Sequence, residues 1–223
     1  MPRISSKQKQ DAVSAPFWQK DKTTSIKLDK TVFGSEINEY ELNRYVYVYR
    51  TNQRKGTVST KTRGMVVGST RKIYGQKKTG RARHGDIKAP IFVGGGVVFG
   101  PQPREFNLKL NKKQKRLALL SALSLKQKNK SVVVIDDNLL LGFDKTKEVS
   151  KFLNDKDLQD KRVLILARPN SEKDIFRPIR NIKNVVCATV DNINPYLLML
   201  ADVVLITKGG LEILEQRYSQ NEN

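Results

Sequence analysis

The sequence predicts an α/β protein: a three-layer body with a mostly parallel sheet, from which a long irregular basic loop extends. Short apolar, β-branched runs alternate with helix-like segments in the C-terminal half, which is typical of a parallel sheet covered on both faces. A glycine-rich stretch, residues 50–104, shows no sustained helical or strand period. The 223 residues, 38% of them hydrophobic, can support one core plus an extension.

The N-terminal part divides into a tail, a strand and a helix. Residues 1–22 mix lysines, acids and proline, which favours a flexible tail. Alternating apolar and polar residues predict a short strand at 23–28. The apolar pattern of residues 35–49 predicts a helix that ends at the basic stretch, and we expect its tyrosines to pack between helix and sheet, with stacking on bases as the alternative.

Beyond the loop, the pair Asn111 and Gln114 has the spacing of a capping box, so a helix is expected to begin there and run to about Lys126. It is apolar nearly all round, which predicts burial. Its first turn holds four cations at the positive end of the helix dipole, which suits a phosphate, although a solvated turn remains the alternative. These cations are Lys112, Lys113, Lys115 and Arg116.

The C-terminal segment is regular and near neutral in charge. Strands are expected at 132–135, 163–166, 185–190 and 203–206, and helices at 145–153, 172–182, 195–201 and 211–218. Residues 136–137 and 207–210 follow strands, where open α/β folds bind ligands, but turn and cap chemistry is the simpler interpretation. The expected domain is therefore residues 23–49 with 105–218, followed by a polar tail at 219–223.

The charge of the chain is concentrated in the loop. Residues 50–104 hold thirteen Lys or Arg against the single acid Asp86, and ten of the fourteen glycines, within a chain of net charge +20. Fixing one backbone residue costs about 1–2 kcal/mol, whereas cations that neutralise phosphates release counterions. We therefore expect a polyanion partner, and an arm that becomes ordered on nucleic acid.

No catalytic or metal-binding constellation is recognisable. Residues 75–80 have the glycine spacing of a phosphate-binding loop, but Arg81 follows where lysine is required, and residues 94–100 miss the dinucleotide fingerprint. His84 has no expected nucleophile or metal-ligand partner beside it. Asp86 is expected to fix a turn or orient an arginine. The sequence thus predicts no enzyme, no cofactor and no metal.

Compartment signals are consistent with the cytoplasm. The single Cys187 lies in an apolar run, so we interpret it as a core thiol, and one cysteine suits a reducing compartment. No run reaches the roughly 18 apolar residues of a membrane span, and the N-terminus has no secretory apolar core. We expect no membrane contact.

The loop resembles a known family. Residues 50–57, 60–64, 76–83 and 94–101 look like the corresponding runs of the bacterial-type ribosomal protein L-four family, and the likeness spans about residues 24–215. At the tip, Tyr74, Gly75 and Lys78 stand where that family commonly has Trp, Arg and Gly.

The resemblance implies a structural, ribosomal-RNA-binding constituent of the large ribosomal subunit that acts in assembly. It implies ribosomal RNA, neighbouring proteins including ribosomal protein L-twenty-two, and the nascent peptide as partners, in the cytoplasmic ribosome, with an organellar ribosome as the alternative. Residues implied to line the nascent-peptide exit tunnel are Gln76, Lys77, Lys78, Thr79, Gly80 and Arg81.

The candidate RNA-binding residues are the cations of the loop and of the following helix. They are Arg50, Arg54, Lys55, Lys61, Arg63, Arg71, Lys72, Lys77, Lys78, Arg81, Arg83, Lys88, Arg104, Lys112, Lys113, Lys115 and Arg116. Tyr74 and Phe92 are candidates for stacking on bases. Two other functions remain open: a regulatory RNA-binding protein acting off the ribosome, for example on its own messenger, and a phosphate-binding α/β enzyme.

Overall fold

The structure is a computed structural model that describes residues 13–19, 22–169 and 172–219. The chain forms two compact units. We call the first, Met1–Tyr49 together with Lys109–Asn223, the α/β unit, and the second, Arg50–Leu108, the arm. The arm therefore extends four residues beyond the predicted boundary at 104.

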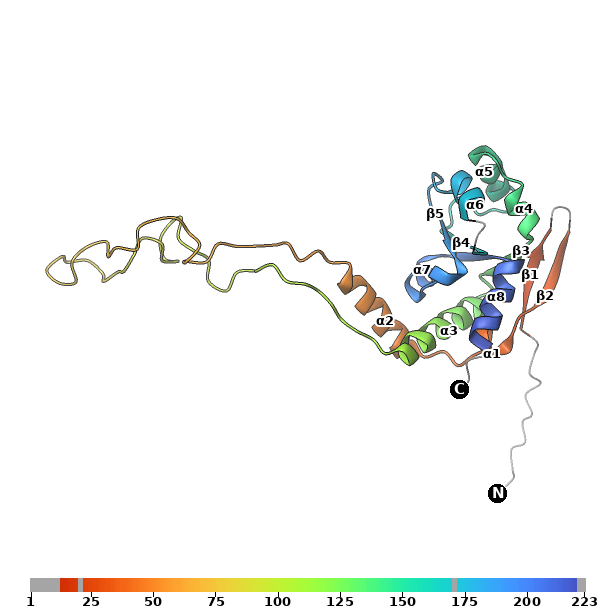
Figure 1. Cartoon of the computed structure of the whole chain (residues 1–223), viewed down its shortest axis with the longest axis horizontal. Helices are drawn as coiled ribbons and strands as arrows, with labels where there is room; N and C mark the ends of the chain where they lie inside the picture. The colour runs from red at the N-terminus through yellow and green to blue at the C-terminus, as the bar shows by residue number, and fades with distance from the viewer. Residues whose placement is uncertain (1–12, 20–21, 170–171, 220–223) are drawn as a thin grey trace, which may run out of the picture. The chain divides into compact units, whose positions relative to one another are not determined.

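The α/β unit contains a six-stranded sheet of order β2-β1-β3-β6-β4-β5 (Figure 1). Neighbouring strands are parallel except for the antiparallel pair β1 and β2. The strands are β1 Ser14–Trp18, β2 Thr23–Lys27, β3 Val132–Ile135, β4 Val163–Ala167, β5 Val185–Thr189 and β6 Val203–Thr207. Five of them coincide closely with the predicted runs, which confirms the fold class.

Strand β1 corrects the prediction of a flexible tail for residues 14–18. Ala15 and Phe17 are buried, and β1 pairs with both β2 and β3. Only two inward-facing residues mark this strand, and Pro16 between them disguised it, because proline is disfavoured within sheets. The other parts of the predicted tails, residues 1–12, 20–21 and 220–223, lie outside the described residues.

Eight α-helices occur among the described residues. They are α1 Lys30–Phe33, α2 Glu39–Asn52, α3 Lys112–Lys128, α4 Asp137–Leu141, α5 Thr146–Asp155, α6 Glu172–Ile179, α7 Pro195–Leu200 and α8 Lys208–Ser219, with a 3₁₀ turn, η1, at Val190–Asn192. The short helices α1 and α4 were not predicted, because one or two turns carry too few residues for a periodic pattern.

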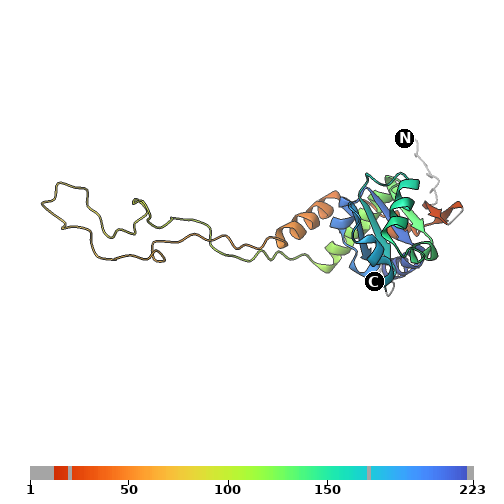
Figure 2. The same ribbon diagram turned by 90° about the horizontal axis from the view of Figure 1, so that it is seen from above.

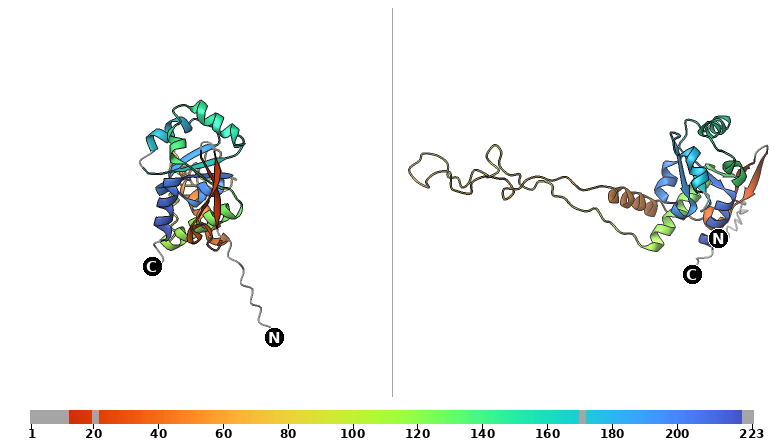
Figure 3. Two further views of the ribbon diagram at one scale, coloured as in Figure 1. Left: turned by 90° about the vertical axis from the view of Figure 1, so that its right-hand side faces the viewer. Right: turned by 45° about the horizontal axis from the view of Figure 1, so that its top comes forward.

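Alternation along the strands produces two cores, one on each face of the sheet. On one face, Val132 and Val134 of β3 pack with apolar residues of α1, α2, α3, α7 and α8. On the other, Val133 and Ile135 pack with α4, α5 and α6. Helices therefore cover both faces, as the views in Figures 2 and 3 show.

Two predictions of burial need correction. Helix α3 buries residues such as Leu123, but Leu117 is 39% exposed, so the helix is not buried all round. Cys187 is half-buried and packs against the second core, because it lies on the edge strand β5.

Within the described parts of the chain, no helix combines the length and apolar character needed to cross a membrane.

Candidate nucleic-acid interface

The predicted RNA-binding cations are nearly all exposed. Among the thirteen in the arm, Lys88 alone is buried, at 9% exposure. Of the four at the start of α3, Arg116 is half-buried and donates to the Tyr218 carbonyl at 2.6 Å. Within residues 50–108, all of which the structure describes, one ion pair forms, between Arg63 and Asp86. Most of the positive charge is therefore available to a partner.

The two limbs of the arm are joined first by side-chain and backbone hydrogen bonds at its base. The Asn52 amide donates to the Leu108 carbonyl at 3.0 Å and accepts from the Leu108 N–H at 2.8 Å. Four residues further on, the Arg104 N–H donates to the Gly56 carbonyl at 3.1 Å. Gly56 has φ +63°, and a Cβ there would lie 1.9 Å from the Arg104 carbonyl oxygen. Only glycine allows this approach.

Further bonds continue this pairing. The Thr60 N–H donates to the Pro101 carbonyl at 3.0 Å, and the Val97 N–H donates to the Lys61 carbonyl at 2.9 Å. Proline cannot donate, but its carbonyl still accepts, so Pro101 fits this position. The arm is thus held by isolated cross-links and not by a continuous β ladder.

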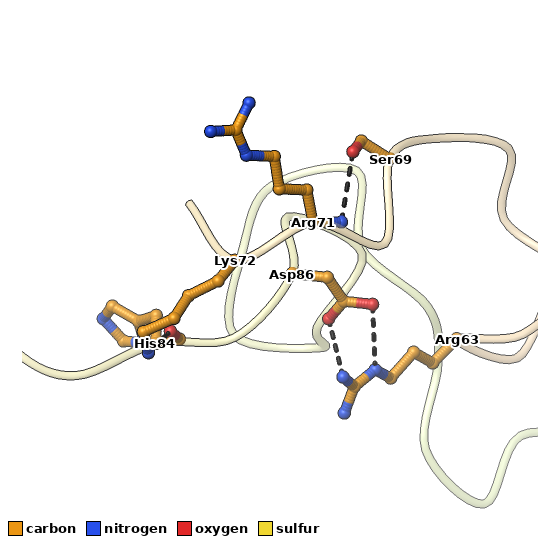
Figure 4. Close-up of polar contacts among 6 residues, drawn as sticks. All are labelled: Arg63, Ser69, Arg71, Lys72, His84 and Asp86. Atoms are coloured by element: carbon orange, nitrogen blue, oxygen red, sulfur yellow. Dashed lines mark hydrogen bonds and ion pairs between the residues drawn. The ribbon is translucent and has the colours of Figure 1, made fainter. Parts of the chain in front are cut away.

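Asp86 and Arg63 form the centre of a compact cluster in the arm (Figure 4). The Asp86 carboxylate forms an ion pair with Arg63 Nη2 at 2.7 Å and accepts a hydrogen bond from Arg63 Nε at 3.3 Å. Asp86 is 6% exposed, and the neighbouring Gly96 N–H donates to the Lys88 carbonyl at 3.0 Å. The expectation that Asp86 orients an arginine is confirmed.

Nearer the tip, His84 lies in an aromatic cluster. Its ring meets Phe92 edge-on at a centroid distance of 5.0 Å and Tyr74 at 6.3 Å. Lys72 Nζ donates to the His84 carbonyl at 2.7 Å, and the Ile73 N–H donates to the Gly85 carbonyl. Tyr74 and Phe92, predicted to stack on bases, thus pack against a histidine within the arm.

The predicted tunnel-lining residues, 76–81, form the exposed tip of the arm. The Tyr74 hydroxyl donates to the Ala82 carbonyl and closes this loop. Lys78 and Gly80 have φ of +66° and +62°, so the backbone turns sharply here. No side chain of residues 76–81 is buried, which leaves the whole tip open to a partner.

In the α/β unit, Tyr45 and Tyr49 of α2 stack on each other, whereas Tyr40 and Tyr47 are 69% and 65% exposed. The Tyr49 ring stacks on Tyr196 of α7 at 4.7 Å and on Tyr45 at 6.4 Å. Burial raises the pKa of the Tyr45 hydroxyl, and the neighbouring Tyr49 adds to the shift. The predicted packing role holds for this pair, although the partner is a helix and not the sheet.

At the start of α3 the predicted capping box is present between Asn111 and Gln114. Lys112, Lys115 and Arg116 line a cavity of about 350 Å³ beside it, within the α/β unit. The cavity is therefore lined by three of the four predicted cations, and phosphate binding there stays a prediction.

The strand ends show cap chemistry. The Asp137 carboxylate accepts from the Gly209 N–H at 2.8 Å, and the Thr207 hydroxyl accepts from the Gly210 N–H at 3.1 Å. Among the described residues, no group of three or more His, Cys, Asp or Glu is arranged to hold a metal ion. The Asp137 and Thr207 side chains at these strand ends thus bond to the backbone of α8, as the turn and cap interpretation predicts.

Sequence reasoning missed Phe106. The guanidinium carbons of Arg54 and Arg104 lie 4.2 and 4.6 Å from the centre of its ring. The one sequence feature that could have pointed to Phe106 is its position two residues after Arg104, an arginine of the loop.

An α/β unit joined to an arm of exposed cations defines a polyanion-binding class of protein. The chain belongs to the family described as the Ribosomal protein L4/L1 family, whose sequence model matches residues 26–217. This membership confirms the resemblance seen in the loop, and with it the prediction of a ribosomal protein in place of an enzyme.

Two relatives illustrate the similarity. The chain is 42% identical over 193 residues to the large ribosomal subunit protein uL4 of Halothermothrix orenii, covering 86% of this chain and 90% of the relative. It is 41% identical over 199 residues to the protein of the same name from Clostridium botulinum strain Okra, covering 89% and 95%.

Proposed function

We propose that this protein is a structural constituent of the large ribosomal subunit, located in the ribosome, that binds ribosomal RNA and takes part in subunit assembly. The observation that carries the proposal is the arm itself. Within residues 50–104, thirteen cations stand against the single acid Asp86, which is already paired with Arg63. The relatives named large ribosomal subunit proteins support the same function over nearly the full chain.

We further propose that residues 76–81 line the nascent-peptide exit tunnel, next to ribosomal protein L-twenty-two. The exposed tip supports this, because every side chain in it is accessible to RNA or peptide. Closure by Tyr74 gives the tip a defined loop that small residues such as Gly80 allow to turn.

Replacing Arg81 and Arg83 together with alanine tests the RNA contact. Both side chains are exposed. If each neutralises a phosphate, the slope of log affinity against log salt concentration falls by roughly one to two units. The measurement is binding of the full chain to a large-subunit ribosomal RNA fragment at several salt concentrations. An unchanged slope contradicts phosphate contact at these positions.

Two further experiments test the location. Tagged protein is expected to sediment with large subunits and their precursors, and recovery mainly outside them favours a regulatory role off the ribosome. For the tunnel, Thr79→Cys in a Cys187→Ser background is expected to cross-link to a stalled nascent peptide. Lys113→Cys, in the α/β unit, is the matched control. Equal cross-linking from both positions refutes the tunnel assignment.

A further inference from the structure

A cavity of about 760 Å³ lies at the base of the arm. This volume falls within the range of small-molecule sites, roughly 300–1,000 Å³. Its chemically active lining comes from both limbs, and all of it belongs to the arm. These residues are Arg54, Lys55, Thr57, Gln102, Arg104 and Phe106.

The backbone builds this cavity. The Arg104 N–H donates to the Gly56 carbonyl, and a Cβ at Gly56 would lie 3.2 Å from Phe106 Cε2 as well as against Arg104. Asn52 and Leu108 bond reciprocally on one side of this contact. The limbs are therefore in register where the cavity opens.

Phe106 holds two guanidinium groups at once. The guanidinium carbons of Arg54 and Arg104 lie 4.2 and 4.6 Å from its ring centre. Like charges repel, so bringing two arginines to one ring is unfavourable unless the ring or an anion compensates. With two cations over it, the Phe106 ring positions charge and is not free to stack on a base.

The N–H donors of the two guanidinium groups that lie over Phe106 make no bond within the arm. Across residues 50–108, which are described without a gap, neither Arg54 nor Arg104 makes an ion pair or a side-chain hydrogen bond. Each guanidinium has five N–H donors in a planar fork, a shape that matches phosphate oxygens. Lys55, also exposed, adds a third cation to the wall.

We propose that this cavity is a binding site for one phosphodiester group of RNA, held by the forks of Arg54 and Arg104, with Phe106 as the positioning residue for both. The proposal rests on the proposed RNA-binding function and adds a defined site to it. Phe106 carries no charge, so its contribution acts entirely through the two arginines.

Phe106→Leu in the full chain tests this, because it keeps an apolar side chain and every charge. We expect its affinity for a large-subunit ribosomal RNA fragment to fall about 5- to 30-fold, the combined effect of two exposed cation–π contacts. The slope of log affinity against log salt concentration should also fall by roughly one to two units, because Arg54 and Arg104 would no longer be held against the phosphate. Phe106→Tyr should restore both values.

Phe99→Leu is the matched control, since Phe99 is a fully exposed aromatic residue of the same arm. Its salt slope should equal that of the wild type. A double-mutant cycle adds Arg54→Lys with Arg104→Lys, which keep the charge and lose the planar fork. In the Phe106→Leu background these changes should cost less than in the wild type.

Each outcome distinguishes the two proposals. Wild-type protein without salt-dependent RNA binding refutes the proposed function itself. Wild-type binding with an unaffected Phe106→Leu variant overturns the phosphodiester site and leaves the function standing. A loss of affinity with an unchanged slope also overturns it, because Phe106 then supports the fold of the arm without positioning charge.

Discussion

Replacing Asp86 with asparagine separates two opposite expectations for the arm. By net charge alone, removing this buried acid should strengthen binding to RNA. Arg63 would then be released to contact a phosphate, which raises the salt slope by about 0.7–0.9. The structure leads to the reverse expectation, because the buried Asp86 carboxylate holds Arg63 through two contacts, at 2.7 and 3.3 Å.

The magnitude follows from these contacts. A hydrogen bond to a charged group contributes about 1.5–3 kcal/mol when it is well shielded. The Arg63 side chain is 58% exposed, so solvent screening reduces the value to about 1 kcal/mol. If the arm must hold this shape to bind, Asp86→Asn weakens RNA affinity by about 5-fold.

The assay is titration of full-length protein against a large-subunit ribosomal RNA fragment, together with hydrogen exchange in the free protein. Exchange at the Gly96 and Val97 amides, which bond to the carbonyls of Lys88 and Lys61, should accelerate in the variant. Glu105→Gln is the matched control, because it removes an exposed acid from the arm. Its binding should be unchanged or tighter. If Asp86→Asn tightens binding to the same degree as Glu105→Gln, the reasoning is wrong.

Two more predictions follow from the geometry. Gly56→Ala should break the bond to Arg104 and lower RNA affinity in the same titration, because φ is +63° and a Cβ has no room; Gly64→Ala, where nothing lies within 4 Å, should bind as the wild type does. Burial raises the pKa of the Glu215 carboxyl, although the Asp29 N–H donates to it at 2.8 Å and opposes the shift. The folded state therefore binds this proton more tightly than the unfolded state, so the contribution of Glu215 is fully present at low pH and declines as pH rises through the usual range of a glutamate, about 4.3, toward the raised value. Chemical denaturation at pH 4 and pH 6 should show Glu215→Gln gaining stability relative to the wild type at the higher pH; equal differences at both would contradict the assignment.

The body of the protein was predictable because its signals are local. The β-branched runs ending at Ile135 and Ile206, and the capping box at Asn111, each lie within a few consecutive residues. Strand β1 was missed because two inward residues around Pro16 carry too little pattern.

The internal order of the arm was not predictable for a different reason. Most links between its limbs join backbone groups 36 to 48 residues apart, such as those of Lys61 with Val97 and of Gly56 with Arg104, and backbone groups leave no trace in the sequence of side chains. Asp86 was the exception, because a lone acid among cations has an evident use. Phe106 was not identified, since an aromatic residue gains its role here only from the two arginines that the fold brings to it.

The reciprocal bond between Asn52 and Leu108 means that the long excursion of residues 53–107 starts and finishes at one place. The entropy of closing a loop grows only with the logarithm of its length, so an insertion of this size adds little more penalty than a short turn. The length and the side chains of residues 53–107 can therefore change while the Asn52 side-chain amide keeps the two ends of this segment together. The fold before Asn52 and after Leu108 need not change with them.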